Sequence, residues 1–67
     1  MHAMKLVTKL GSEGKQIGVH WLFTTPRVGD HIVGPDSKVW KIEAVGHYSH
    51  LQRHAEGPVG ELAVTEA

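Results

Sequence analysis

The 67-residue chain contains no cysteine, which excludes disulfide bonds and thiolate metal sites. It has no excess of either charge, because seven lysine and arginine residues balance seven acidic residues. That balance argues against the broad basic face with which proteins usually bind nucleic acid. No apolar run is as long as a membrane-spanning helix. We therefore expect one small cytoplasmic domain, residues 1–67, that does not bind membranes; residues 1–3 are either a leader ahead of Met4 or part of the domain.

The sequence also lacks the common motifs of catalysis. It contains no Gly-x-Ser-x-Gly elbow, no phosphate-binding glycine loop and no His-Glu-x-x-His motif. A closed barrel of this length would be filled by side chains, which would leave no interior pocket. These absences predict that the protein is not an enzyme and has neither catalytic residues nor a cofactor.

Short segments of alternating apolar and polar residues, separated by glycine and proline turns, make up most of the chain. This pattern is typical of β-strands, and no segment keeps the 3.6-residue period of a helix. The sequence predicts an all-β fold, a single small five-stranded SH3-like barrel, with an OB-like barrel as the second choice. The expected strands cover residues 4–10, 15–23, 28–33, 38–48 and 59–65. Residues 49–58 suit either one helical turn or an open loop.

Two strands carry the strongest indications of a core. In the second, one face, which we expect to be buried, carries Ile17, Val19, Trp21 and Phe23, and only Leu22 breaks the pattern. In the fourth, Val45 falls out of phase, and a β-bulge near Ala44 would return it to the core face. The residues expected to be mostly buried are Ile17, Val19, Trp21, Ile32, Trp40, Ile42, Val45, Leu62 and Val64.

Residues 26–32, Pro-Arg-Val-Gly-Asp-His-Ile, and residues 39–47, Val-Trp-Lys-Ile-Glu-Ala-Val-Gly-His, carry a family resemblance. Together they resemble a pattern in small uncharacterised bacterial and phage proteins, in which a Val-Gly-Asp turn opens one strand and an aromatic-led strand follows. SH3-like and KOW-type barrels have similar signatures. The resemblance covers about a third of the chain; it implies a barrel and no activity. Asp30 in this turn is expected to accept hydrogen bonds from nearby backbone amides.

Histidine is unusually frequent, with six in the chain. His47, His50 and His54 are spaced i, i+3, i+7, so they would share one face of a helix, and imidazole is a common metal ligand. They are the only metal candidates, and we favour a solvated loop with no metal site. His20 and His31 lie in expected strands and would pair if those strands were neighbours.

The function that these observations favour is a small non-catalytic binding or assembly module. Its core is small and its net charge is zero, so self-association or a protein partner is expected. The alternatives are a nucleic-acid-binding barrel and a small enzyme with an intersubunit site. Tyr48 is expected to be the most exposed aromatic residue. The expected interaction surface consists of Gly18, His20, Leu22, Arg27 and Tyr48.

Overall fold

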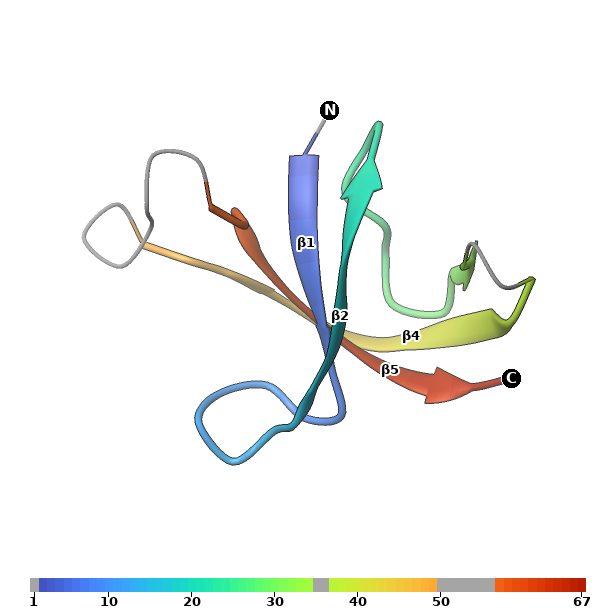
Figure 1. Cartoon of the computed structure of the whole chain (residues 1–67), viewed down its shortest axis with the longest axis horizontal. Helices are drawn as coiled ribbons and strands as arrows, with labels where there is room; N and C mark the ends of the chain where they lie inside the picture. The colour runs from blue at the N-terminus through green and yellow to red at the C-terminus, as the bar shows by residue number, and fades with distance from the viewer. Residues whose placement is uncertain (1, 35–36, 50–56) are drawn as a thin grey trace.

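The computed structural model describes residues 2–34, 37–49 and 57–67. Within these ranges there are five strands and no helix, and therefore no helix that would cross a membrane (Figure 1). The predicted all-β class with five strands is confirmed. The choice between a helical turn and an open loop at residues 49–58 falls mostly on positions outside the described residues. The strands are β1 (His2–Val7), β2 (Gln16–Leu22), β3 (His31–Val33), β4 (Val39–His47) and β5 (Gly60–Glu66).

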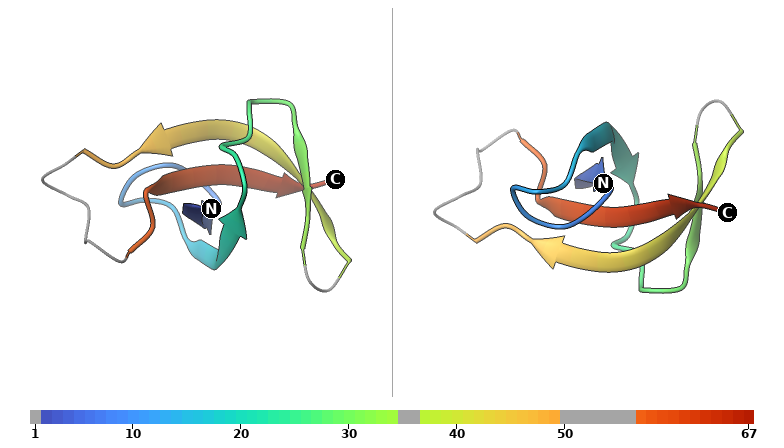
Figure 2. Two further views of the ribbon diagram at one scale, coloured as in Figure 1. Left: turned by 90° about the horizontal axis from the view of Figure 1, so that it is seen from above. Right: turned by 90° about the horizontal axis from the view of Figure 1, so that it is seen from below.

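All five strands form one sheet in the order β2-β1-β5-β4-β3. The pairs β1–β2, β3–β4 and β4–β5 are antiparallel, whereas β1 and β5 are parallel. The β1–β2 hairpin crosses β4 and β5 steeply, so the sheet curls into a half-barrel, as the views of Figure 2 also show. This shape is consistent with a small SH3-like barrel.

The half-barrel stays open between its two outer strands. β2 and β3, both fully described, are not paired with each other in the sheet, so the closure expected for a barrel is not reached. Each therefore keeps one edge without a neighbouring strand in the sheet. His20 and His31 consequently do not pair across neighbouring strands. A groove of about 350 Å³ lies at this open side, with Leu22 and Phe23 on one wall and His31 and Ile32 on the other.

The main core lies on the inner face of the curl. The register places Met4 opposite Gly60 and His20, and Leu6 opposite Leu62 and Gly18. Because Gly60 has no side chain, the Gly46 carbonyl of β4 approaches it closely; a Cβ there would collide with that oxygen. The buried cluster consists of Met4, Leu6, Ile32, Ile42, Leu62 and Val64, with Leu22, Trp40, Val45 and Val59 packed against it.

Most of the predicted core is confirmed, and so is the predicted bulge. Ile32, Ile42, Leu62 and Val64 are buried, and Trp40 and Val45 are half-buried. The β4–β5 register shifts between Ile42 and Ala44, which leaves Glu43 as the extra residue. Val45 then pairs with Leu62 and packs against the core, which is the effect the out-of-phase pattern predicted.

The predicted burial of β2 is wrong. Ile17, Val19 and Trp21 are 41%, 43% and 65% exposed, because they lie on the outer face of the curl. β1 decides this outcome, since its apolar residues Met4 and Leu6 share a face with His20 and Gly18 in the observed register. Alternation separates the two faces of a strand, but only pairing decides which face is buried.

Polar hydrogen bonds stabilise two turns, the β1–β2 hairpin and the turn that leads into β3. The Thr8 amide donates to the Lys15 carbonyl (3.0 Å), and the Lys15 amide donates to Thr8 Oγ1 (2.9 Å), which closes the β1–β2 hairpin. In the turn before β3, the Arg27 amide donates to Asp30 Oδ2 (2.8 Å), so the predicted role of Asp30 is confirmed. Gly29 supplies the positive φ of 94° that this turn requires.

The core assignment predicts a large difference between two alanine substitutions. We expect Leu62→Ala to lower the free energy of unfolding by about 3 kcal/mol, through lost burial and the cavity left behind. A core this small supplies only roughly 3–5 kcal/mol, so the variant would be largely unfolded. Val33→Ala, at a side chain 69% exposed, should change stability by less than about 0.5 kcal/mol. Urea unfolding followed by circular dichroism checks both; similar losses in the two variants would contradict the assignment.

Candidate functional site

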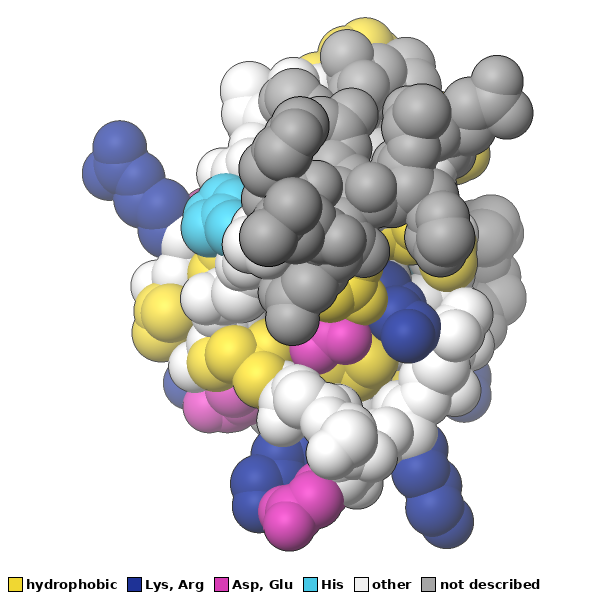
Figure 3. Space-filling view, turned by 90° about the vertical axis from the view of Figure 1, so that its left-hand side faces the viewer, with side chains coloured by type: hydrophobic (Ala, Val, Ile, Leu, Met, Phe, Trp, Pro, Cys, Tyr) yellow, Lys and Arg dark blue, Asp and Glu magenta, His cyan; other side chains and the backbone are white. Residues whose placement is uncertain are grey.

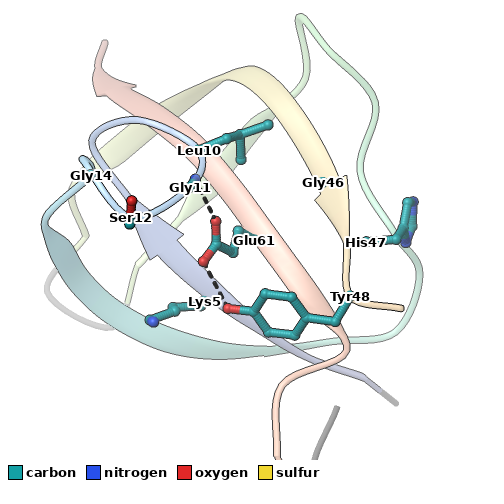
Figure 4. A pocket seen from close by; sticks show the side chains of 9 residues that line it. All are labelled: Lys5, Leu10, Gly11, Ser12, Gly14, Gly46, His47, Tyr48 and Glu61. Atoms are coloured by element: carbon teal, nitrogen blue, oxygen red, sulfur yellow. Dashed lines mark hydrogen bonds between the residues drawn. The ribbon is translucent and has the colours of Figure 1, made fainter. Parts of the chain in front are cut away.

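A pocket of about 560 Å³ lies on the outer face of the sheet (Figure 4). β1, β4 and β5 form its floor, and the loop between β1 and β2 folds over one side. Lys5 of β1 is the register partner of Glu61 of β5, which brings the two opposite charges together in the parallel pair. The lining residues are Lys5, Leu10, Gly11, Ser12, Gly14, Gly46, His47, Tyr48 and Glu61.

Glu61 organises this pocket. Its Oε1 accepts a hydrogen bond from the Gly11 amide (3.1 Å), and its Oε2 accepts one from the Tyr48 hydroxyl (2.8 Å). These two contacts connect the β1–β2 loop and the end of β4 to the central strand β5. Leu10 of the same loop lies against Gly46, where a Cβ would be only 3.3 Å from Leu10 Cδ1. One carboxylate therefore fastens a loop and a strand end to the sheet.

The environment moves the two titratable groups in opposite directions. The Gly11 amide, followed by the Tyr48 hydroxyl and the charge of Lys5, lowers the pKa of Glu61, against the opposing effect of its partial burial. Partial burial, followed by the hydrogen bond to Glu61 and its negative charge, raises the pKa of Tyr48 to about 12. Both groups therefore keep their ordinary charge at neutral pH.

These directions are unfavourable for acid–base catalysis. A general base or acid works best when its pKa lies near the working pH, whereas the pKa values of Glu61 and Tyr48 move away from 7. The His47 side chain points away from Glu61 (Figure 4), so it does not extend the pair into a relay. The arrangement is that of a structural tie.

A second feature is the exposed outer face of β2. We define the apolar stripe as Ile17, Val19 and Trp21 of β2 together with Phe23, the residue after the strand. Phe23 is 83% exposed and Trp21 65%. Residues 16–25 contain no lysine, arginine, aspartate or glutamate. The stripe therefore lies on a strand that has a free edge and no charge along it.

The residues expected to form one interaction surface are separated in the structure. Gly18, His20 and Leu22 of β2 are half-buried on the inner face, while Arg27 is exposed in the turn before β3. Tyr48 is half-buried in the outer-face pocket, so the expectation that it is the most exposed aromatic is wrong. Trp21 and Phe23 are exposed instead. The charge-free stretch at 16–25 was the signal in the sequence that pointed to this strand.

The histidines form no metal site in the described part of the chain. There, no group of three histidine, cysteine, aspartate or glutamate side chains is arranged to hold an ion. His47 ends β4 and is exposed. His50 and His54, the other two metal candidates, lie outside the described residues.

No family model, curated protein or solved structure matches this chain. The resemblance to SH3-like proteins of bacterial and phage type therefore stays a prediction.

The structural tie predicts how stability depends on pH. The folded-state pKa of Glu61 is lowered, so its contribution to stability is present above the unfolded pKa and is lost as the pH falls through the folded pKa. Tyr48 behaves oppositely: its contribution is present below pH 10 and is lost as the pH rises towards about 12. We expect Tyr48→Phe to lower stability by about 1 kcal/mol at pH 7 and to reduce the loss above pH 10.

Denaturant unfolding from pH 2 to 11.5 checks this expectation. Glu61→Gln should flatten the acid side of the profile of stability against pH. The alkaline side should stay steep in this variant only if the Tyr48 hydroxyl keeps a hydrogen-bond partner. The matched control is Glu66→Gln, since Glu66 is exposed and lies at the end of β5. The structural tie would be contradicted if the wild-type profile had the same slopes as the profiles of Tyr48→Phe and Glu61→Gln.

Proposed function

We propose that this chain is a small non-catalytic binding and assembly module that docks a protein partner on β2. The observation that carries the proposal is the combination of a free strand edge with the exposed apolar stripe. An open edge presents backbone donors and acceptors to an incoming strand, and exposed alternate side chains add apolar contact and specificity.

The edge of β2 lacks most of the devices that usually prevent such pairing. Edge strands are commonly protected by lysine, proline or inward-pointing charge. β2 has none of these, and its register shift, at which Ile17 is the extra residue, lies at one end of the strand. β3, the other edge, is only three residues long and therefore offers little backbone to a partner.

A catalytic role is less well supported by the outer-face pocket. The Glu61 carboxylate already accepts hydrogen bonds from Gly11 and Tyr48. The pKa values of Glu61 and Tyr48 are both shifted away from 7. We therefore propose no reaction and no cofactor there. A cytoplasmic location, also proposed, rests on the absence of cysteine.

Strand addition is testable with a synthetic peptide. We expect a peptide copying residues 15–25 to bind the isotope-labelled protein and to shift backbone amide signals of β2 and of its neighbour β1. The same peptide carrying Val19→Pro should bind far more weakly, since proline removes a ladder donor and disfavours an extended pair. Heteronuclear NMR titration measures both. No shifts at millimolar peptide, or shifts centred on β3, would contradict the docking surface.

The exposed aromatic residues favour one second candidate, single-stranded nucleic acid. Bases stack on exposed aromatic rings, and Trp21 and Phe23 are available for this. The charge distribution is less suitable. Figure 3 shows basic and acidic side chains interspersed on the face that it presents, and residues 16–25 carry no lysine or arginine. The basic residues beside this strand are Lys5, opposite Val19, and Lys15, which directly precedes β2.

We therefore expect nucleic acid to bind weakly and to depend steeply on salt. Titration with an oligothymidine, followed by tryptophan fluorescence, should give a dissociation constant of roughly 100 µM or weaker at physiological salt. Trp40 is half-buried against the core, so we expect the fluorescence change on binding to come from Trp21. Trp21→Leu should therefore remove it. Tight binding that persists at high salt would make nucleic acid the leading candidate.

A further inference from the structure

The chemistry of the β2 strand indicates which partner its free edge would accept. We infer that β2 pairs antiparallel with β2 of a second copy of this chain, about a two-fold axis at Val19. This inference rests on the proposed docking surface and names its partner.

The first argument is charge. In a two-fold pairing of identical strands, the same surface faces itself, so any charged residue near the axis would oppose a like charge. Residues 16–25 carry no lysine, arginine, aspartate or glutamate. The net charge of the chain is zero, so whole-molecule repulsion is also small. β2 is thus suited to a copy of itself.

The second argument is the register that the axis at Val19 produces. Val19 then meets its own copy, and Ile17 meets Trp21 of the second copy on the outer face. On the inner face, Gly18 meets His20 of the second copy, where the missing side chain of glycine leaves room for an imidazole. Aromatic residues beside β-branched residues are favourable cross-strand pairs. The apolar stripes of the two copies would lie side by side in one continuous ten-stranded sheet.

The third argument is area. Trp21 and Phe23, exposed by 65% and 83%, leave roughly 300 Å² of side chain in contact with water, given the usual size of aromatic side chains. Ile17, Val19 and the strand edge add to this. Stable specific interfaces bury roughly 800 Å² per partner, and weaker ones begin below about 600 Å². The patch therefore lies below the area of an obligate interface and fits a weak, reversible dimer.

Sedimentation velocity of the full chain, from about 5 to 500 µM, tests the inference. We expect a reversible monomer–dimer equilibrium. Val19→Glu should raise the dissociation constant at least tenfold, because it places two carboxylates against each other at the axis. Within one chain, the introduced carboxylate would face Lys5, so the fold should tolerate it. Val33→Glu on the β3 edge is the matched control and should leave association unchanged.

A charge-swap experiment separates pairing at the axis from general damage. Val19→Glu and Val19→Lys should each be monomeric alone and should form a mixed dimer when combined at equal concentration. Circular dichroism verifies that each variant is folded. A monomeric wild-type chain at 500 µM, a dimer insensitive to Val19→Glu, or failure of the mixture to associate would overturn the inference.

The outcomes also separate this inference from the proposed function. If the wild-type chain is monomeric but the peptide of residues 15–25 still shifts β2, the docking surface stands and the inference that a second copy of the chain occupies it fails. If neither the peptide nor a second copy binds at β2, both proposals fail. Quenching by oligothymidine without dimerisation would instead assign the exposed aromatic residues to nucleic acid.

Discussion

The register of the β1–β2 hairpin is the constraint on which the rest of the molecule depends. It places Met4 and Leu6, both fully buried, on the same face as Gly18 and His20. Ile17, Val19 and Trp21 of β2 are left on the outer face by the same register. Core and exposed stripe are therefore two results of one pairing.

Much of this architecture was predictable from the sequence, and the failure has a clear physical cause. The all-β class, the number of strands, the Glu43 bulge and the turn role of Asp30 all follow from local signals: alternation, its interruption and turn chemistry. The sequence of β2 alone does not show which of its faces is buried, because alternation separates the two faces without distinguishing them. Only the partner strand decides, and β1 contains the deciding pattern: Lys5 alternates with Met4 and Leu6, so the face that carries Lys5 is the outer one.

The two candidate sites also differ in how far the sequence predicts them. The partnership of Tyr48 with Glu61 joins residues 13 apart in sequence, and that of Gly11 with Glu61 joins residues 50 apart. No sequence motif predicts such contacts, because they depend on the parallel β1–β5 pair and on the fold of the hairpin loop. The uncharged stretch at residues 16–25, by contrast, is visible in the sequence. Its meaning changes from core to surface once β2 is known to be an edge strand.

The parallel pairing of β1 with β5 also has a consequence for how the chain folds. It joins Met4 to Gly60 and Leu6 to Leu62, the contacts of greatest sequence separation among the strand pairs. The β1–β2 hairpin closes locally, whereas the pair that unites the two halves of the sheet waits for almost the whole polypeptide. Topologies dominated by such long-range contacts fold slowly, over milliseconds to seconds. During that interval the uncharged, β-prone β2 has at most β1 as a partner and keeps its other edge open, so it is a site at which chains can misassemble.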